Sequence, residues 1–200
     1  MFVERSPRLT ACSFCLVLYA AVLMCVPVSA QPVISSQTVW GTASDGMRMA
    51  ISAVKSGPTT QHDAQFDVAF QNVGSKDAVL NLGYMLGNGK EQAPEAVRIT
   101  LTDRNGKSEG VQWSRRGGVA GRVDDFIVAL PSGATYVLGL NLERAAVEKL
   151  DAGRYRIAAR FEGKGAQYRN LDMSGIGLMN FWIGTIQAMP LEFEIADQRP

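Results

Sequence analysis

The sequence predicts an all-β fold, an antiparallel β-sandwich of about eight or nine strands. Apolar and polar residues alternate with a period of two in segment after segment, and clusters of Gly, Pro, Asn and Asp separate these segments. Only residues 143–150 have a spacing that suits one or two helical turns. Short strands, frequent turns and almost no helix are typical of sandwiches, so we expect one β domain.

The first half of the domain contains four alternating segments joined by turn-forming residues. The predicted strands are Met47–Ala53, Phe66–Phe70, Leu80–Leu86 and Val97–Leu101. We expect Leu80, Leu82, Tyr84 and Leu86 to share one face. A turn is predicted at 72–77, a loop at 87–95, and a hairpin turn at 103–107, because Asn105-Gly106 accepts the positive φ values of such turns.

The second half continues the alternation. The predicted strands are Val111–Trp113, Val123–Leu130, Tyr136–Leu142, Tyr155–Phe161, Trp182–Met189 and Leu191–Ile195, with a turn at 131–133. Arg154, Arg156 and Arg160 fall on the outer side of their strand. We expect Glu192 and Glu194 of the last strand to neutralise them across the sheet.

The amino-terminal residues 1–30 predict a cleavable signal peptide. Arg5 and Arg8 precede an apolar stretch at 11–26, and Val28-Ser29-Ala30 forms a small-x-small cleavage site. A permanent anchor, which needs about 20 apolar residues, is the alternative. We therefore expect export to the periplasm or beyond, with no membrane attachment after cleavage. The remaining predicted parts are a flexible lead-in at 31–38, one domain at 39–196 and a tail at 197–200.

Cleavage at this site changes the composition. Of the 200 residues, 170 remain, and Cys12, Cys15 and Cys25 are all removed, so the exported domain has no cysteine and no disulfide. Loss of two arginines and one glutamate takes the formal net charge from +1 to zero. The full chain, which is 46% hydrophobic with a formal net charge of only +1, suits neither a nucleic-acid groove nor a disordered protein.

Few side chains suited to catalysis or metal binding remain after cleavage. His62 is the single histidine, no Gly-x-Ser-x-Gly elbow is present, and zinc sites need more His or Cys ligands. Asp103-x-Asn105-Gly106 begins like a calcium loop, but Ser114 occupies the twelfth position, so a hairpin turn is favoured. We predict no catalytic residue, no metal and no cofactor.

Adjacent carboxylates occur at Asp124-Asp125 in a predicted strand. Neighbouring residues of a strand point to opposite faces, which prevents joint chelation, so we expect one of the pair to bind Arg122 or to cap a loop.

Two segments are candidates for contacting a partner. The Gly-rich loop at 114–122 carries Arg115, Arg116 and Arg122, which could bind a carboxylate or phosphate; a solvated loop is the favoured alternative. The second segment, 171–182, interrupts the strand pattern and is rich in large apolar groups: Met173, Ile176, Leu178, Met179 and Phe181. Exposed, it would bind a partner. Folded over an open end of the sandwich, which we favour, it would complete the core.

Three motifs resemble immunoglobulin-like sandwiches. Leu150-Asp151-Ala152-Gly153-Arg154-Tyr155 is similar to their Leu-x-x-Gly-x-Tyr corner, which implies that Leu150, Gly153 and Tyr155 are structural and that the tyrosine hydroxyl bonds back to the corner. The ending from Trp182 to Ile195, with its break at Pro190, resembles the closing strand of secreted bacterial immunoglobulin-like domains. Leu130-Pro131-Ser132-Gly133 resembles one of their turns.

A weaker similarity runs to the intracellular proteinase inhibitor family, whose strand order residues 66–72, 97–113 and 150–158 follow. This chain departs from that family by its export signal and by an insert at 163–179.

Together these features predict a non-catalytic binding or structural module of the periplasm or cell surface. The expected partner is another envelope or secreted protein or a surface polymer, and not nucleic acid. The alternatives are a protease inhibitor that uses a surface loop and a hydrolase with an unrecognised carboxylate site.

Overall fold

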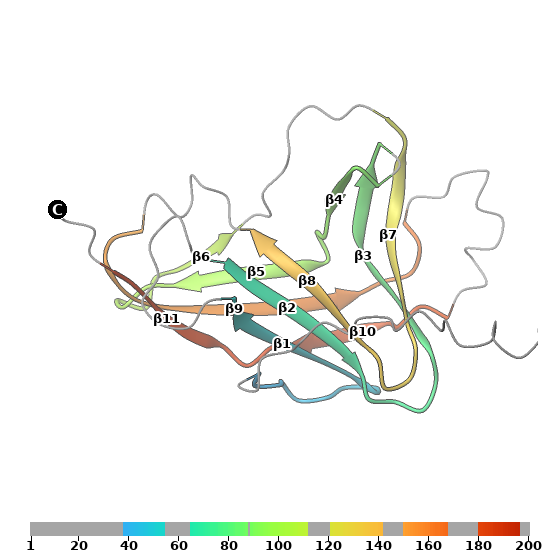
Figure 1. The fold of residues 1–200 in the computed structure, drawn as a ribbon, viewed down its shortest axis with the longest axis horizontal. Coiled ribbons are helices and arrows are strands. Elements are labelled where there is room, and N and C mark those ends of the chain that lie inside the picture. The colour runs from blue at the N-terminus through green and yellow to red at the C-terminus, as the bar shows by residue number, and fades with distance from the viewer. Residues whose placement is uncertain are drawn as a thin grey trace, which may run out of the picture. The chain divides into compact units, whose positions relative to one another are not determined.

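The computed structural model describes residues 38–54, 65–87, 89–111, 121–141, 150–167 and 180–196. All of them belong to one compact unit, Pro32–Pro200. They form eleven strands, shown in Figure 1, and no helix, and every pair of neighbouring strands is antiparallel. The all-β antiparallel class is confirmed, with more strands than the eight or nine expected.

The strands form three sheets. The first sheet has the order β1-β2-β8, the second has β10-β9-β5-β6 with β11 also paired to β9, and the third has β4-β3-β7. Their bounds are β1 Met47–Ala53, β2 Gln65–Asn72, β3 Ala78–Leu86, β4 Glu91–Ala93, β5 Val97–Thr102, β6 Ser108–Val111, β7 Val123–Leu130, β8 Thr135–Asn141, β9 Gly153–Gly163, β10 Gly184–Gln187 and β11 Leu191–Ile195.

Most predicted strands are present at close to their expected bounds. One exception is β4, which lies inside the predicted loop at 87–95 and pairs Glu91–Ala93 with the end of β3. Another is β6, which starts at Ser108, earlier than expected, to complete the hairpin with β5. The predicted helical turns fall almost entirely outside the described residues, as do Gln112, Trp113 and Leu142.

A β-bulge changes the expected pattern of β3. The register shifts by one residue between Asn81 and Tyr84, so Leu82 and Gly83 together lie opposite Phe126 of β7. Leu80 and Leu82 are fully buried as predicted. Beyond the bulge, Met85 packs against the core in place of Tyr84 and Leu86. The prediction that Tyr84 and Leu86 share the face of Leu80 and Leu82 is therefore wrong, because the extra residue in the bulge reverses the alternation of side chains.

The core lies between the inward faces of the first and second sheets, and buried residues of the third sheet, such as Leu80 and Phe126, belong to the same cluster. Phe66 and Phe70 of β2 meet Phe193 of β11 and Phe161 of β9 edge to face, with ring centroids 5.0 and 5.2 Å apart. Such aromatic pairs contribute about 0.5–1.5 kcal/mol beyond the burial of their area. Alternating residues of both sheets, buried as predicted, surround these rings.

One buried asparagine holds the corner where β2 turns into β3 and β7 turns into β8; the two strand pairs meet there in Figure 1. The side chain of Asn72 is buried, and its amide donates to the carbonyl oxygens of Lys76 at 2.8 Å and Leu130 at 2.9 Å. Its Oδ1 accepts from the Gly74 N–H at 3.0 Å. Backbone bonds to Gly133 and Ala134 add to this network.

The last two strands both pair with β9, on either side of a break at residues 188–190 that contains Pro190. Glu194 lies opposite Arg154, and Glu192 lies opposite Arg156, so the expected alignment of opposite charges is present for these two arginines. It is wrong for Arg160, which lies opposite Gln187 and Arg98 because β10, and not β11, pairs with that part of β9. None of the side chains in the two Glu–Arg pairs forms an ion pair with another described residue. The attraction between them therefore acts across solvent.

Tyr155 makes the contact that the corner motif implies. Its hydroxyl donates to the carbonyl oxygen of Asp151 at 2.9 Å, and its ring stacks on Phe193 with centroids 5.8 Å apart. Leu150 packs beside it against the core. Burial raises the pKa of Tyr155 above its ordinary value, and the nearby carboxylate of Asp151 raises it further.

We predict that Asn72→Ala lowers the free energy of unfolding by about 2–4 kcal/mol, because the buried carbonyl oxygen of Leu130 and the part-buried one of Lys76 lose their donor. Urea denaturation measures the change. Asn105→Ala in the exposed turn after β5 is the matched control and should stay within about 0.5 kcal/mol of the wild type. Equal stabilities for the two variants would contradict the role given to Asn72.

We predict that Tyr155→Phe costs about 1 kcal/mol at pH 7 through the lost hydroxyl bond. Because the folded-state pKa is raised, unfolded tyrosine ionises first, and stability falls as the pH rises above 10.0; Tyr155→Phe should make that fall shallower. Urea denaturation at several pH values measures both effects.

Tyr136→Phe is the control for this experiment. Burial also raises the pKa of Tyr136, but its hydroxyl has no hydrogen bond to another described residue. Tyr136→Phe should make the free energy of unfolding fall less steeply above pH 10.0 and leave its value at pH 7 almost unaltered. A Tyr155→Phe protein as stable as the wild type at pH 7 would show that the corner bond contributes nothing.

Candidate functional site

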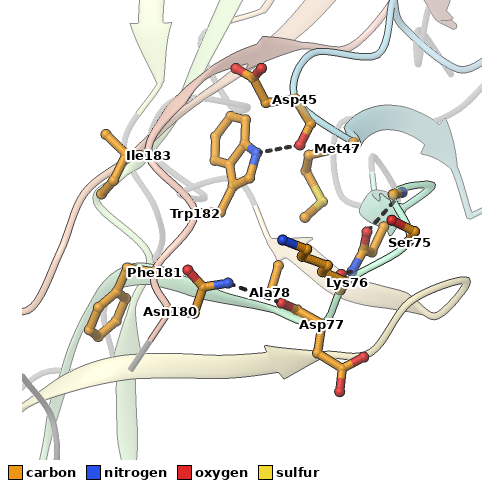
Figure 2. A pocket seen from close by; sticks show the side chains of 13 residues that line it. Asp45, Met47, Ser75, Lys76, Asp77, Ala78, Asn180, Phe181, Trp182 and Ile183 are labelled. Carbon is orange, nitrogen blue, oxygen red and sulfur yellow. Dashed lines mark hydrogen bonds between the residues drawn. The ribbon is translucent and has the colours of Figure 1, made fainter. Parts of the chain in front are cut away.

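A pocket of about 360 Å³ opens at the Asn72 corner. Three segments line it: the turn at 45–47, the connection from β2 to β3 at 72–78, and residues 180–183 ahead of β10. Figure 2 shows the side chains around it. The pocket therefore depends on parts of the chain that are more than a hundred residues apart in sequence.

The first wall is a tight hairpin turn. Ser44 and Met47 exchange two backbone hydrogen bonds of 2.9 Å, and both intervening residues, Asp45 and Gly46, have positive φ. Asp-Gly is a preferred pair for a two-residue turn of this kind. This turn is not among those predicted from the sequence, although Asp45-Gly46 directly before an alternating segment is a typical signal of a hairpin turn.

This turn docks directly on the second wall. The carbonyl oxygen of Gly46 accepts from the N–H groups of Val73 at 2.7 Å and Gly74 at 3.0 Å. A Cβ atom on Gly46 would lie 2.9 Å from the Cα of Gly74, so the close approach requires glycine. The hydrogen bonds fix the two walls relative to each other.

The second wall supplies the charged groups. Asp77 accepts from the backbone N–H of Ser132 at 3.0 Å, which holds its carboxylate toward the β7–β8 turn. Lys76 extends its side chain into the pocket (Figure 2). Its ammonium group forms no ion pair with another described residue. Asp45 and Asp77 also line the pocket, so the lining carries one cation and two carboxylates.

The third wall is Trp182, which is only 8% exposed. Its indole N–H donates to the carbonyl oxygen of Asp45 at 3.1 Å, and its ring stacks on Phe161 with centroids 5.8 Å apart. Gly163 and Gly184 leave the space that the indole fills, since a Cβ on either would approach the ring to within 3 Å. Trp182 is thus a wall of the pocket that is held in place by the core.

Residues 180–182 continue this wall as a short parallel extension beside β3. Val79 donates to Asn180 at 3.1 Å and accepts from Trp182 at 2.8 Å, and Val79 and Phe181 form a parallel bridge. The Asn180 amide donates to the Asp77 carbonyl at 3.3 Å. Ile183, which also lines the pocket, follows with 62% of its surface exposed, and its side chain lies on the opposite side of this segment from Trp182 (Figure 2).

The structure places only part of the predicted contact segments. Phe181 lines the pocket and Trp182 completes the core, whereas Met173, Ile176, Leu178 and Met179 lie outside the described residues. Arg115 and Arg116 also lie outside them, as does His62. Arg122 forms a 2.7 Å ion pair with Asp124, as expected for one of the two adjacent aspartates.

The second of the two adjacent aspartates, Asp125, is buried. Its Oδ1 accepts from the Asn81 amide at 2.7 Å and from the Gln167 N–H at 2.9 Å. Asn81 also donates to the Gly165 carbonyl oxygen at 2.9 Å. Asn81 lies at the β3 bulge, and this network ties the third sheet to the segment that follows β9. The two aspartates therefore have separate partners and separate structural roles.

The other carboxylate motif is also structural. Asp103 Oδ1 accepts from the N–H groups of Asn105 at 2.8 Å and Lys107 at 2.9 Å, which closes the β5–β6 hairpin and confirms the predicted turn. Across the described ranges, no group of three or more His, Cys, Asp or Glu residues could hold a metal ion. The same ranges contain no helix long and apolar enough to span a membrane.

Comparison with known proteins leaves the family open. No family model matches the chain, and no curated protein matches it. Two solved structures are similar at TM-scores of 0.40 and 0.32. The first, the X-ray structure of Northeast Structural Genomics Consortium target SoR45, is 14% identical; the match covers 77% of this chain and 90% of that one. The second, AvmM, which catalyses macrocyclization in alchivemycin A biosynthesis, is 13% identical, with 78% and 92% covered.

We predict that Gly163→Ala lowers the free energy of unfolding by about 1–3 kcal/mol, because the new methyl group would lie 2.5 Å from the Trp182 ring and must displace it. Gly165→Ala is the matched control, since a Cβ there meets nothing within 4 Å. Denaturant unfolding of both variants tests the prediction, which fails if Gly163→Ala is as stable as Gly165→Ala.

Proposed function

We propose that this chain is an exported, immunoglobulin-like β-sandwich that acts as a non-catalytic binding module, and that the pocket at the Asn72 corner receives part of its partner. The amino-terminal sequence supports export. The Tyr155–Asp151 bond, the facing antiparallel sheets and the closing strand broken at Pro190 support an immunoglobulin-like arrangement.

The observation that carries the proposal is the combination of groups in one rigid pocket. Lys76 offers a positive charge beside two carboxylates, the Asn180 side chain offers a polar group, and Ile183 offers exposed apolar surface. The walls are fixed by hydrogen bonds among their backbones, so binding would order few groups. Preorganised sites of this kind lose less conformational entropy when they bind.

The size of the pocket restricts what can enter it. A volume of about 360 Å³ is near the lower end of the range of about 300–1,000 Å³ for small-ligand sites. It suits one amino-acid side chain or one sugar ring of a larger partner. The partner we propose is accordingly another secreted or envelope protein or a surface polymer, with an acidic or hydrogen-bonding group directed at Lys76.

We predict that at least one probe from an array of acidic peptides and cell-wall oligosaccharides binds the purified chain. Lys76→Gln should weaken this binding about tenfold by removing a charge-assisted contact. Ile183→Ser should weaken it through lost apolar contact. Both side chains are exposed, so neither variant should change the unfolding curve.

Two matched controls lie away from the pocket. Lys107→Gln removes a lysine from an exposed turn, and Met189→Ser removes an apolar side chain that is 50% exposed. Binding that these controls reduce as much as the pocket variants do would place the contact elsewhere. Absence of binding by every probe would favour the purely structural module.

A further inference from the structure

The outer face of β9 carries three exposed arginines whose neighbours across the sheet differ in charge. Arg154 and Arg156 lie opposite glutamates of β11. Arg160 instead lies opposite Arg98 of β5 on one side and Gln187 of β10 on the other. One end of this face is therefore matched in charge, and the other end is not.

The nearest carboxylate does not restore the balance at the unmatched end. Glu162 is 4.0 Å from Arg98 and 3.6 Å from Lys164, so two cations share one negative charge. Arg160 forms no ion pair or side-chain hydrogen bond with any described residue. Directly opposed residues have Cβ atoms about 4.5–5.5 Å apart, and like charges at that spacing destabilise a sheet.

We propose that Arg98 and Arg160 bind an oxyanion of the phosphate, sulfate or carboxylate class between their guanidinium groups, with the Gln187 amide as a third donor. A guanidinium group has no acceptor and presents a planar fork of N–H donors that matches the oxygens of such an anion. An anion between the two arginines replaces their repulsion with two charge-assisted interactions.

This site is independent of the pocket. The two share no residue, and the arginines lie on the outer face of the second sheet, opposite to the side that packs into the core. Arg160 and Gln187 are exposed, and the side chain of Arg98 is 74% exposed. A free ion and an acidic group carried by a polymer can therefore both reach it, and the chemistry of recognition is the same.

Titration of the purified chain with sodium sulfate, against sodium chloride at equal ionic strength, tests the proposal. NMR signals of the arginine Nε–H groups report binding site by site. We expect saturable shifts for Arg98 and Arg160, and an affinity about tenfold lower in Arg160→Gln, as for the loss of one charge-assisted pair. In a second arm, heparin serves as a polymer that carries sulfate groups.

Arg154→Gln is the matched control, because it removes the same charge from the same face of the same strand at the end that faces Glu194. It should leave the affinity within about twofold of the wild type. Heparin that binds tighter than sulfate, with the same dependence on Arg160, would identify a polymer-borne anion, and equal affinities would identify a free ion. The proposal is overturned if no shift saturates or if Arg154→Gln weakens binding as much as Arg160→Gln.

Discussion

The buried amide of Asn72 is the interaction on which the arrangement of the sheets and the pocket depends. It satisfies carbonyl oxygens on both sides of a corner where two connections pass each other. Without it, the buried carbonyl oxygen of Leu130 would lose this donor, at a cost of about 1–3 kcal/mol, and the part-buried one of Lys76 would lose it as well. Because Gly74 also binds Asn72, the same residue fixes the platform on which the Asp45–Gly46 turn rests.

The pocket is a consequence of this corner and of one tryptophan. Trp182 joins the pocket to the core, since its ring stacks on Phe161 while its N–H binds the turn at Asp45. Gly163 and Gly184 leave the space that the indole fills, since a Cβ on either would lie within 3 Å of the ring. The result is a pocket whose walls are set by the core. Its exposed lining residues are Asp45, Ser75, Lys76, Asp77, Asn180 and Ile183.

Charges on the outer face of the second sheet follow from the packing of its inner face. Ile157, Ala159 and Phe161 are buried, which fixes the register of β9 against its neighbours. A shift by one residue would turn these side chains to solvent. The register therefore also determines which residue lies opposite each exposed arginine of β9: Glu194 lies opposite Arg154, and Arg98 lies opposite Arg160.

The sequence by itself determined the class of fold and most of the strands, because alternation is a local property that each strand carries in its own residues. β7 occupies Val123–Leu130 as predicted, and β9 buries the predicted face. Local signals also identified the hairpin turn at 103–107, where Asp103 binds the backbone of its own loop. Asp45-Gly46 is a local signal of the same kind, and it indicates the turn between Ser44 and Met47.

Only the tertiary structure decided the pairing of strands, the bulge in β3 and the pocket. Asn72 illustrates the reason: its sequence neighbours mark a turn, but one of its acceptors is Leu130, 58 residues later. Likewise, nothing local in Arg160 distinguishes it from Arg154, since the difference lies in which strand supplies the opposite residue. Alternation fixes which way a side chain faces, whereas long-range packing fixes what it meets.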